Sequence, residues 1–137
     1  MISLSKIYKS LLEYTHVVSD DKDIISAIRD IRNLGPSNPF LSTETIINDN
    51  VKLEVSKFDG SLWIQSISTI EHGKGDASKV LKMVCDIADK HNVVIRMAPT
   101  PYGTEKGLNK TQLINWYKRY GFKKIPWGQM ERLPNIV

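Results

Sequence analysis

Apolar residues recur at helical spacing in four parts of the chain, which predicts four amphipathic helices. They are expected at residues 4–12, 19–34, 77–90 and 109–120. Gly35 and Pro36 are placed to end the second helix. In the fourth, Asn109 and Gln112 form a capping-box pattern, and Gly121 follows as a left-handed terminator.

Strand patterns lie between and after these helices. Residues 51–56 alternate between apolar and polar, and Asp59-Gly60 is a two-residue hairpin signal that pairs them antiparallel with a strand over 61–71. Residues 45–48 are a candidate short strand after a loop at 36–43. Residues 93–97 form a short buried run, and 122–133 are expected to supply one or two closing strands. The order predicts an α+β domain built on a mixed sheet.

The composition is that of an ordinary globular domain. Of 137 residues, 41% are hydrophobic and 25% are charged, so we expect a single domain over residues 1–137. No apolar run approaches the ~20 residues that cross a bilayer, and the N-terminus lacks signal-peptide features. With one cysteine, Cys85, no internal disulfide is possible, and we expect Cys85 in the core. These features favour a cytoplasmic protein without membrane contact.

Charge is unevenly divided along the chain. Residues 1–70 hold 7 Lys and Arg against 9 Asp and Glu, whereas residues 71–137 hold 12 against 6. A basic half suits a partner that carries phosphates, either a cofactor or a nucleic acid. A solvated basic surface explains the excess almost as well.

The turn at residues 72–78 joins the strand at 61–71 to the third helix. Glycines let backbone N–H groups approach an anion, and the helix start adds further N–H donors. Lys74 places a cation in the same turn. Neither the Walker spacing nor the Gly-x-Gly-x-x-Gly fingerprint is present. The turn therefore predicts an anion site of another kind, or a plain strand-to-helix connection.

This turn resembles the acyl-CoA loop of the GNAT superfamily of N-acetyltransferases, Gln/Arg-x-x-Gly-x-Gly/Ala. His72 takes the Gln/Arg place, Gly75 and Ala77 take the small-residue places, and Ser78 follows. Residues 113–122 are similar to the family's later motif, a helix that ends in Phe/Trp-Tyr-x-x-x-Gly-Phe. Two motifs in the right order are more specific than either alone, and the resemblance covers roughly residues 50–134.

The resemblance implies a GNAT-like fold: a mixed, mostly antiparallel central sheet flanked by helices, with a splayed strand pair for acyl-CoA. It also implies acetyl-CoA as co-substrate and a primary amine as acceptor. The proline-bearing end of the 93–97 strand is compatible with the splay. The residues expected to bind acetyl-CoA are Ile67, Ser68, Thr69, His72, Gly73, Lys74, Gly75, Asp76, Ala77, Ser78 and Asn109.

The catalytic roles also come from the resemblance. A backbone N–H near Ile67, where the family's strand bulges, polarises the thioester carbonyl. Tyr117 is the expected proton donor to the leaving thiolate, although the same tyrosine could simply pack on the apolar face of its helix. The general base is not identifiable: Glu71, Glu54 and His72 are candidates, with Glu71 preferred, and each carboxylate could equally be a solvated strand residue. No cluster has metal-ligand spacing, so no metal is expected.

Two departures from the family pattern support an alternative. His72 replaces Gln or Arg, and Asp76 brings a negative charge beside the expected pyrophosphate. The alternative is a weak or inactive GNAT-fold binding protein, either a host-defence inhibitor or a nucleic-acid-associated module. Its basic residues would be Lys118, Arg119, Lys123 and Lys124.

The compact form resembles small phage and bacterial members of the family, some of which modify a lysine of a host-defence protein. The acceptor here is a small molecule or a protein amine that the sequence does not identify. The chain is expected to be a monomer or a homodimer.

Overall fold

The computed structural model describes residues 16–38, 41–71, 73–100 and 108–135. The helix expected at 4–12 and the site residue His72 lie outside these residues. In chain order the elements are α2 (Asp21–Arg32), β1 (Ser37–Asn38), β2 (Leu41–Ile47), β3 (Val51–Phe58), β4 (Ser61–Thr69), α3 (Asp76–His91), β5 (Ile95–Met97), α4 (Lys110–Lys118), β6 (Lys123–Ile125) and β7 (Gln129–Arg132).

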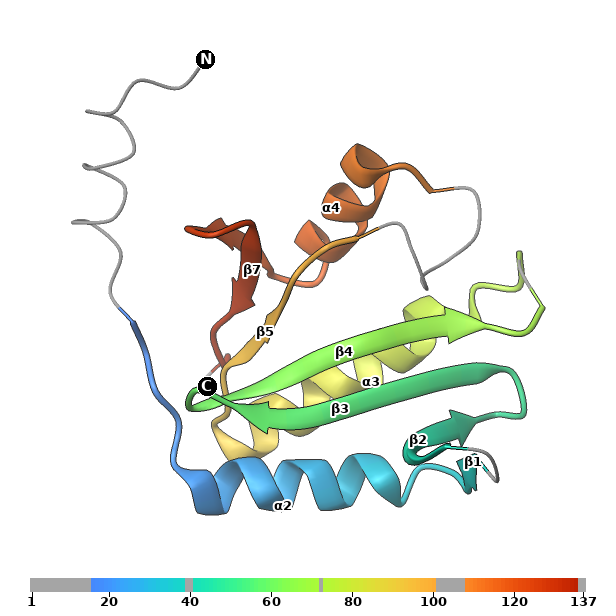
Figure 1. The fold of residues 1–137 in the computed structure, drawn as a ribbon, viewed down its shortest axis with the longest axis horizontal. Coiled ribbons are helices and arrows are strands. Elements are labelled where there is room, and N and C mark those ends of the chain that lie inside the picture. The colour runs from blue at the N-terminus through green and yellow to red at the C-terminus, as the bar shows by residue number, and fades with distance from the viewer. Residues whose placement is uncertain (1–15, 39–40, 72, 101–107, 136–137) are drawn as a thin grey trace.

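The described strands form one seven-stranded sheet in the order β1-β2-β3-β4-β5-β7-β6. Its neighbours pair antiparallel except β4 and β5, which are parallel. The helices α2 and α3 pack against each other and against β3 and β4 (Figure 1). The expected fold class, α+β with a mixed and mostly antiparallel sheet flanked by helices, is confirmed.

The parallel pair separates almost as soon as it forms. Its partners are Leu62 with Ile95 and Trp63 with Arg96, after which β4 continues to Thr69. Figure 1 shows β5 turning away from β4 toward α4. This divergence is the splayed pair that the sequence predicted, and it leaves one edge of β4 without a strand partner in the described part of the chain.

The core lies between the sheet and the two packed helices. The stripe of α2 and the long face of α3 are buried as their spacing predicts, and Cys85 is 4% exposed among them. Burial raises the pKa of the Cys85 thiol to about 11, so it stays protonated as a core residue. From α4, Leu113 and Tyr117 reach the same core.

The turn chemistry read from the sequence is confirmed at the β3–β4 hairpin and after α4. Asp59 and Gly60 have φ values of 50° and 70° and close the β3–β4 hairpin. Asn92, at φ 58°, ends α3, and Gly121, at φ 93°, follows α4. These turns fix where β4 begins and where α3 and α4 end.

The loop expected at residues 36–43 is wrong in part, because β1 and the first three residues of β2 lie within it. The N–H of Ile46 donates to Pro36 O at 2.9 Å, which starts this pairing directly after α2. Such a close approach needs Gly35, since a Cβ atom there would lie 2.0 Å from Ile46 O. Gly35, which was interpreted as a helix stop, therefore also allows the backbone of β2 to pack closely against it.

The bulge in β4 lies slightly earlier than expected. Glu54 pairs with Ser66 and Val55 with Ile64, so Gln65 is the extra residue. Before the bulge the buried residues are the even-numbered Leu62 and Ile64, and after it they are the odd-numbered Ile67 and Thr69, so the inserted residue shifts the buried alternation by one. The family resemblance placed the bulge near Ile67, and the strand pairing places it two residues earlier, since only the register with β3 determines which residue is inserted.

Candidate active site

The turn between β4 and α3 is shaped by two glycines in the left-handed region. Gly73 and Gly75 have φ values of 86° and 72°, a conformation that L side chains rarely adopt. Among the described residues, nothing lies within 4 Å of a Cβ atom built at either position. Gly75 is the N-cap of α3 and supplies no side-chain cap. The N–H of Lys79 donates to Gly75 O, so the N–H groups before it in α3, those of Ala77 and Ser78 among them, have no acceptor within the helix and are of the kind that can bind an anion.

Asn50, in the turn between β2 and β3, braces the turn between β4 and α3. Its side-chain oxygen accepts from the N–H of Glu71 at 2.7 Å, and its amide donates to Glu71 O at 3.1 Å and to Asp76 Oδ2 at 2.7 Å. The Asp76 side chain is 20% exposed and is held toward the β2–β3 turn. Sequence reasoning missed Asn50, since nothing in a turn-like Asn-Asp-Asn run indicates a partner 26 residues away.

Lys74 and Glu71 pair across the turn. Their Nζ and Oε2 atoms are 2.5 Å apart, and both side chains are largely exposed. The hydrogen bond and charge of Lys74 lower the pKa of Glu71, and the same contact raises the pKa of Lys74. The Lys74 ammonium, which was expected to contact phosphate, is therefore paired with a carboxylate. The same pairing makes Glu71, the preferred general base, a weaker base.

The open edge of β4 presents backbone N–H groups. The N–H of Leu62 donates to Val94 O on the β5 side, whereas that of Ile70 donates to Asn50 O on the β3 side. Since N–H directions alternate along a strand, the N–H of Ile67 points to the open edge. Ile67 is itself buried at 2% exposure, Ser68 is half-buried and Thr69 is buried.

The helix α4 is tied to the start of α3. The indole N–H of Trp116 donates to Ser78 Oγ at 2.8 Å, and the Trp116 side chain is buried. The expected capping box is present, with Asn109 Oδ1 accepting from the Gln112 N–H at 2.9 Å. The Asn109 oxygen is therefore engaged in the cap. The Trp116–Ser78 bond was not foreseen, because a motif match does not reveal what an indole nitrogen contacts.

Tyr117 is almost fully enclosed, at 1% exposure. Its ring contacts those of Trp116 and Phe122, with centroids 4.9 Å and 5.3 Å away. Burial raises the pKa of the phenol, and among the described residues no hydrogen-bond partner is found for its hydroxyl. A buried hydroxyl without a partner is uncommon, and such a hydroxyl is available to form a hydrogen bond with a bound ligand.

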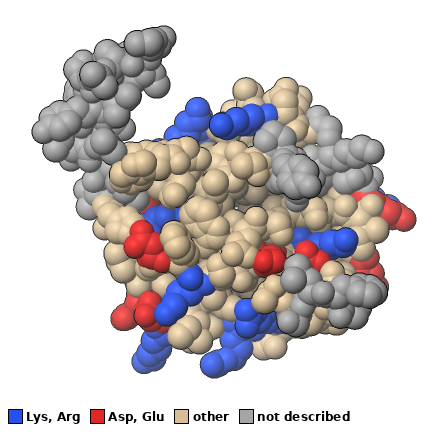
Figure 2. Space-filling model, in the orientation of Figure 1, with Lys and Arg blue, Asp and Glu red and all other residues tan. Residues whose placement is uncertain are grey.

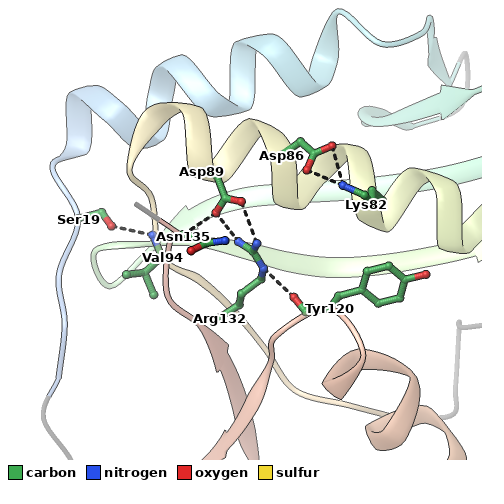
Figure 3. Close-up of polar contacts among 8 residues, drawn as sticks. All are labelled: Ser19, Lys82, Asp86, Asp89, Val94, Tyr120, Arg132 and Asn135. Carbon is green, nitrogen blue, oxygen red and sulfur yellow. Dashed lines mark hydrogen bonds and ion pairs between the residues drawn. The ribbon is translucent and has the colours of Figure 1, made fainter. Parts of the chain in front are cut away.

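A cluster around Arg132 secures the far end of α4 and the strand β7 (Figure 3). Its guanidinium donates to both carboxylate oxygens of Asp89 on α3, at 2.7 Å and 2.9 Å, and to Tyr120 O at 2.7 Å. The N–H of Asn135 also donates to Asp89, at 2.8 Å. Burial opposes the shift, but these bonds outweigh it and lower the pKa of Asp89. The cluster holds the element that carries Tyr117 against α3.

The structure brings together much of the predicted site. The glycine turn, Ser78 and the start of α3 lie next to Trp116, which precedes Tyr117 on α4. The turn follows directly from the open edge of β4 that carries Ile67. Glu71 and Lys74 belong to the same turn, but their side chains pair with each other at the surface.

No protein-family model and no curated protein matches the sequence. The solved structure of the anti-CRISPR protein AcrVA5 is similar, with a TM-score of 0.52 and 18% identity, over 61% of this chain and 90% of that chain. At this identity the likeness shows the fold. Together with the splayed β4–β5 pair, it supports the GNAT-like fold class, whereas membership of the superfamily stays a prediction.

The described residues lack two features that other classes of protein require. Within them no helix has the length and apolar character needed to span a bilayer. Across the same residues, His, Cys, Asp and Glu side chains form no group of three that could hold a metal ion.

Proposed function

We propose that this protein is an acyl-CoA-dependent N-acetyltransferase that moves an acetyl group from acetyl-CoA directly to a primary amine. The observation that carries the proposal is the junction of an open strand edge and an anion-accepting turn on one segment, β4 through the start of α3. Acetyl-CoA combines an amide-bearing arm with a pyrophosphate. The edge suits the arm and the turn suits the pyrophosphate.

Within this proposal the turn residues bind through their backbone. Gly73 and Gly75 leave the approach free of side chains, and the N–H groups of Ala77 and Ser78 meet the phosphates. Asp76, whose charge would repel them, is turned toward Asn50 at 2.7 Å. The position of Asp76 removes one of the two sequence-based objections to acyl-CoA binding, and the other, His72, lies outside the described residues.

In the transfer step the acceptor nitrogen attacks the thioester carbonyl carbon, the carbon–sulfur bond breaks, and the ammonium proton passes to the base or to the thiolate. The Ile67 N–H, which faces the open edge, donates to the carbonyl oxygen as negative charge develops there. Tyr117 donates a hydrogen bond to the leaving sulfur. Because burial raises the pKa of its phenol above that of a thiol, stabilising the thiolate is favoured over complete proton transfer.

Glu71 remains the proposed base, acting through water at the end of β4. Its pairing with Lys74 lowers its pKa, so it is ionised at neutral pH and available to accept a proton, but it is a weak acceptor. Entry of a pyrophosphate would compete for Lys74. Cofactor binding would then release Glu71 for its role.

The test is calorimetric titration with acetyl-CoA of the native protein and of Gly75→Glu. Gly128→Glu is a matched control, because Gly128 has φ 70° against 72° for Gly75 and neither glycine has an atom within 4 Å of an added Cβ. Both variants add the same charge and comparable strain. Micromolar binding that is lost in Gly75→Glu and kept in Gly128→Glu supports the turn's role.

A second candidate is an inhibitor of bacterial defence that keeps the fold without its chemistry. The likeness to an anti-CRISPR protein and the Lys74–Glu71 pair favour it. If native protein gives no heat with acetyl-CoA, and unfolds at the same temperature with and without it, the acetyltransferase proposal fails and this candidate takes its place.

A further inference from the structure

A trough of about 420 Å³ lies where the strands β4 and β5 begin to diverge. Trp63 and Arg96, which are the last residue pair between these strands, both line it. Because side chains alternate along a strand, Trp63 lies on the opposite face of β4 from the core residues Leu62 and Ile64. The trough is therefore on the face of the sheet away from the core, beside the start of the open edge of β4. Its volume is within the range of small-molecule sites.

Two aromatic rings line the trough. Phe58 is 57% exposed, and its ring centroid lies 5.6 Å from that of Trp63 at an interplanar angle of 63°. This edge-to-face contact leaves ring faces uncovered that a stacked pair would hide. The faces of Trp and Phe rings carry the negative potential that attracts ammonium groups. The ring of Trp127 borders the trough as well, but it already has a partner within the chain, so the site depends on Phe58 and Trp63.

The charged groups that line the trough leave one carboxylate oxygen available to a cation. The side chain of Asp59 is 64% exposed, and its Oδ2 lies 3.2 Å from His16 Nε2. Among the described residues no donor reaches the other oxygen, Oδ1. The positive charge of Arg96 is compensated, because its Nε donates to Glu131 Oε2 at 2.8 Å and both side chains are buried. Uncovered rings beside an available carboxylate oxygen form a site for an ammonium group.

The surface charge around the trough favours the same kind of ligand. Over α4, at the top of the view, Figure 2 shows basic side chains and no acidic ones, whereas the acidic side chains at its left lie over the hairpin end of β3 and β4 and the start of α2. The hairpin carries Asp59, and the start of α2 carries Asp20, Asp21 and Asp23. Lys57, in the same hairpin, is paired with Asp21 at 3.1 Å. A molecule with several positive charges is therefore attracted to this end of the sheet.

The trough and the proposed position of acetyl transfer lie on the same strand. Trp63 pairs with Ser56 and Ile67 pairs with Leu53, and these partners are three residues apart on β3. At about 3.3 Å per residue, the separation is about 10 Å. A molecule that fills the trough and also presents a nitrogen beside the Ile67 N–H must therefore be extended.

We propose that the acceptor is an extended aliphatic amine with at least two nitrogen atoms. One nitrogen stays protonated in the trough, against the rings of Phe58 and Trp63 and the carboxylate of Asp59. The other, deprotonated, attacks the thioester beside Ile67 by the transfer step given above. This inference rests on the proposed acetyltransferase function and names its acceptor class. A protein lysine would bring an uncharged amide backbone to the trough, where the rings and the carboxylate suit a cation.

Binding is tested by calorimetric titration without acetyl-CoA, with 1,8-diaminooctane and, as an uncharged probe of the same length, 1,8-octanediol. The diamine is expected to bind and the diol is not. Phe58→Leu should weaken binding of the diamine about 2- to 5-fold. Asp59→Asn should weaken it by a similar factor, and asparagine keeps the hairpin because it accepts the φ of 50°. The matched control is Asp49→Asn, at an exposed turn position with φ 57°, which should leave binding unchanged.

The acceptor role is tested by acetyl transfer to three other amines. Octylamine lacks the second charge, 1,3-diaminopropane is too short for the span, and Nα-acetyl-lysine amide mimics a protein lysine. The kcat/KM for 1,8-diaminooctane should exceed that for each by about tenfold or more.

Failure of the diamine to bind, equal losses in Asp59→Asn and Asp49→Asn, or equal use of any of the three other amines would overturn this inference and leave the acetyltransferase proposal standing. Absence of transfer to every amine, together with absence of acetyl-CoA binding, would instead overturn the acetyltransferase proposal and the acceptor role with it.

Discussion

Replacing Asn50 by alanine should loosen the turn between β4 and α3. The change removes two neutral hydrogen bonds to the backbone of Glu71 and one to the carboxylate of Asp76. Neutral bonds contribute about 1 kcal/mol each and a bond to a charged group about 1.5–3 kcal/mol. Because the Asp76 side chain is 20% exposed, water replaces part of this, and we expect a loss of about 3 kcal/mol.

That loss predicts a measurable fall in thermal stability. At about 2.1 cal/mol/K per residue, the unfolding entropy of 137 residues is about 290 cal/mol/K, so Tm should fall by about 10 °C. The assay is thermal unfolding followed by circular dichroism. Asn115→Ala, at an exposed position on α4, is the control and should change stability by less than about 0.5 kcal/mol.

The same variant should bind acetyl-CoA about tenfold more weakly, because Asp76 is no longer held away from the phosphates. Asn50→Asp should be more destabilising than Asn50→Ala at neutral pH, since it sets a second carboxylate against Asp76. A Tm within 2 °C of the native value, together with full acetyl-CoA affinity, would refute the reasoning that Asn50 organises this turn.

Three other expectations follow from the same contacts. Tyr117→Phe should lower kcat about 10²-fold or more and leave acetyl-CoA affinity unchanged, and an unchanged kcat would contradict the catalytic role. The same change should raise the free energy of unfolding by about 1 kcal/mol, because it removes a buried hydroxyl without a partner. Lys74→Met should raise the pKa of Glu71 and move the acidic limb of the kcat/KM profile to higher pH if Glu71 is the base, whereas an unmoved limb removes Glu71 from the mechanism. The folded-state pKa of Asp89 is lowered, so its stabilisation is present above the unfolded pKa near ~3.9 and is lost as pH falls through the folded value; acid titrations should show a shallower loss in Asp89→Asn than in the native protein.

The sequence predicted those parts of the fold that depend on local chemistry. The capping box at Asn109, the hairpin at Asp59 and the terminator at Gly121 each follow from what one residue type can do at one φ/ψ. What it missed depends on distant partners. Nothing near Asn50 in the chain indicates Asp76, and nothing near Trp116 indicates Ser78.

The site was predicted unevenly for the same reason. The glycines of the turn are dictated by backbone geometry, so a motif locates them. The direction of a flexible charged side chain is not dictated by backbone geometry. Lys74 was expected to contact phosphate, but it pairs with Glu71. The shift of the bulge from Ile67 to Gln65 is a third case, since only the pairing with β3 determines which residue is inserted.

The brief pairing of β4 with β5 divides the molecule into two parts that differ in how they can assemble. The strands β1 to β4 follow one another through short turns, so their contacts are local and close early in folding. The strands β5, β7 and β6 join that unit through two residue pairs and through side chains such as Arg132. The open edge of β4, where we propose that acetyl-CoA binds, therefore lies between an early-folding unit and a later one. A bound molecule lying along that seam would suppress the opening of the later unit, and amide hydrogen exchange in β5 and β7 would slow first.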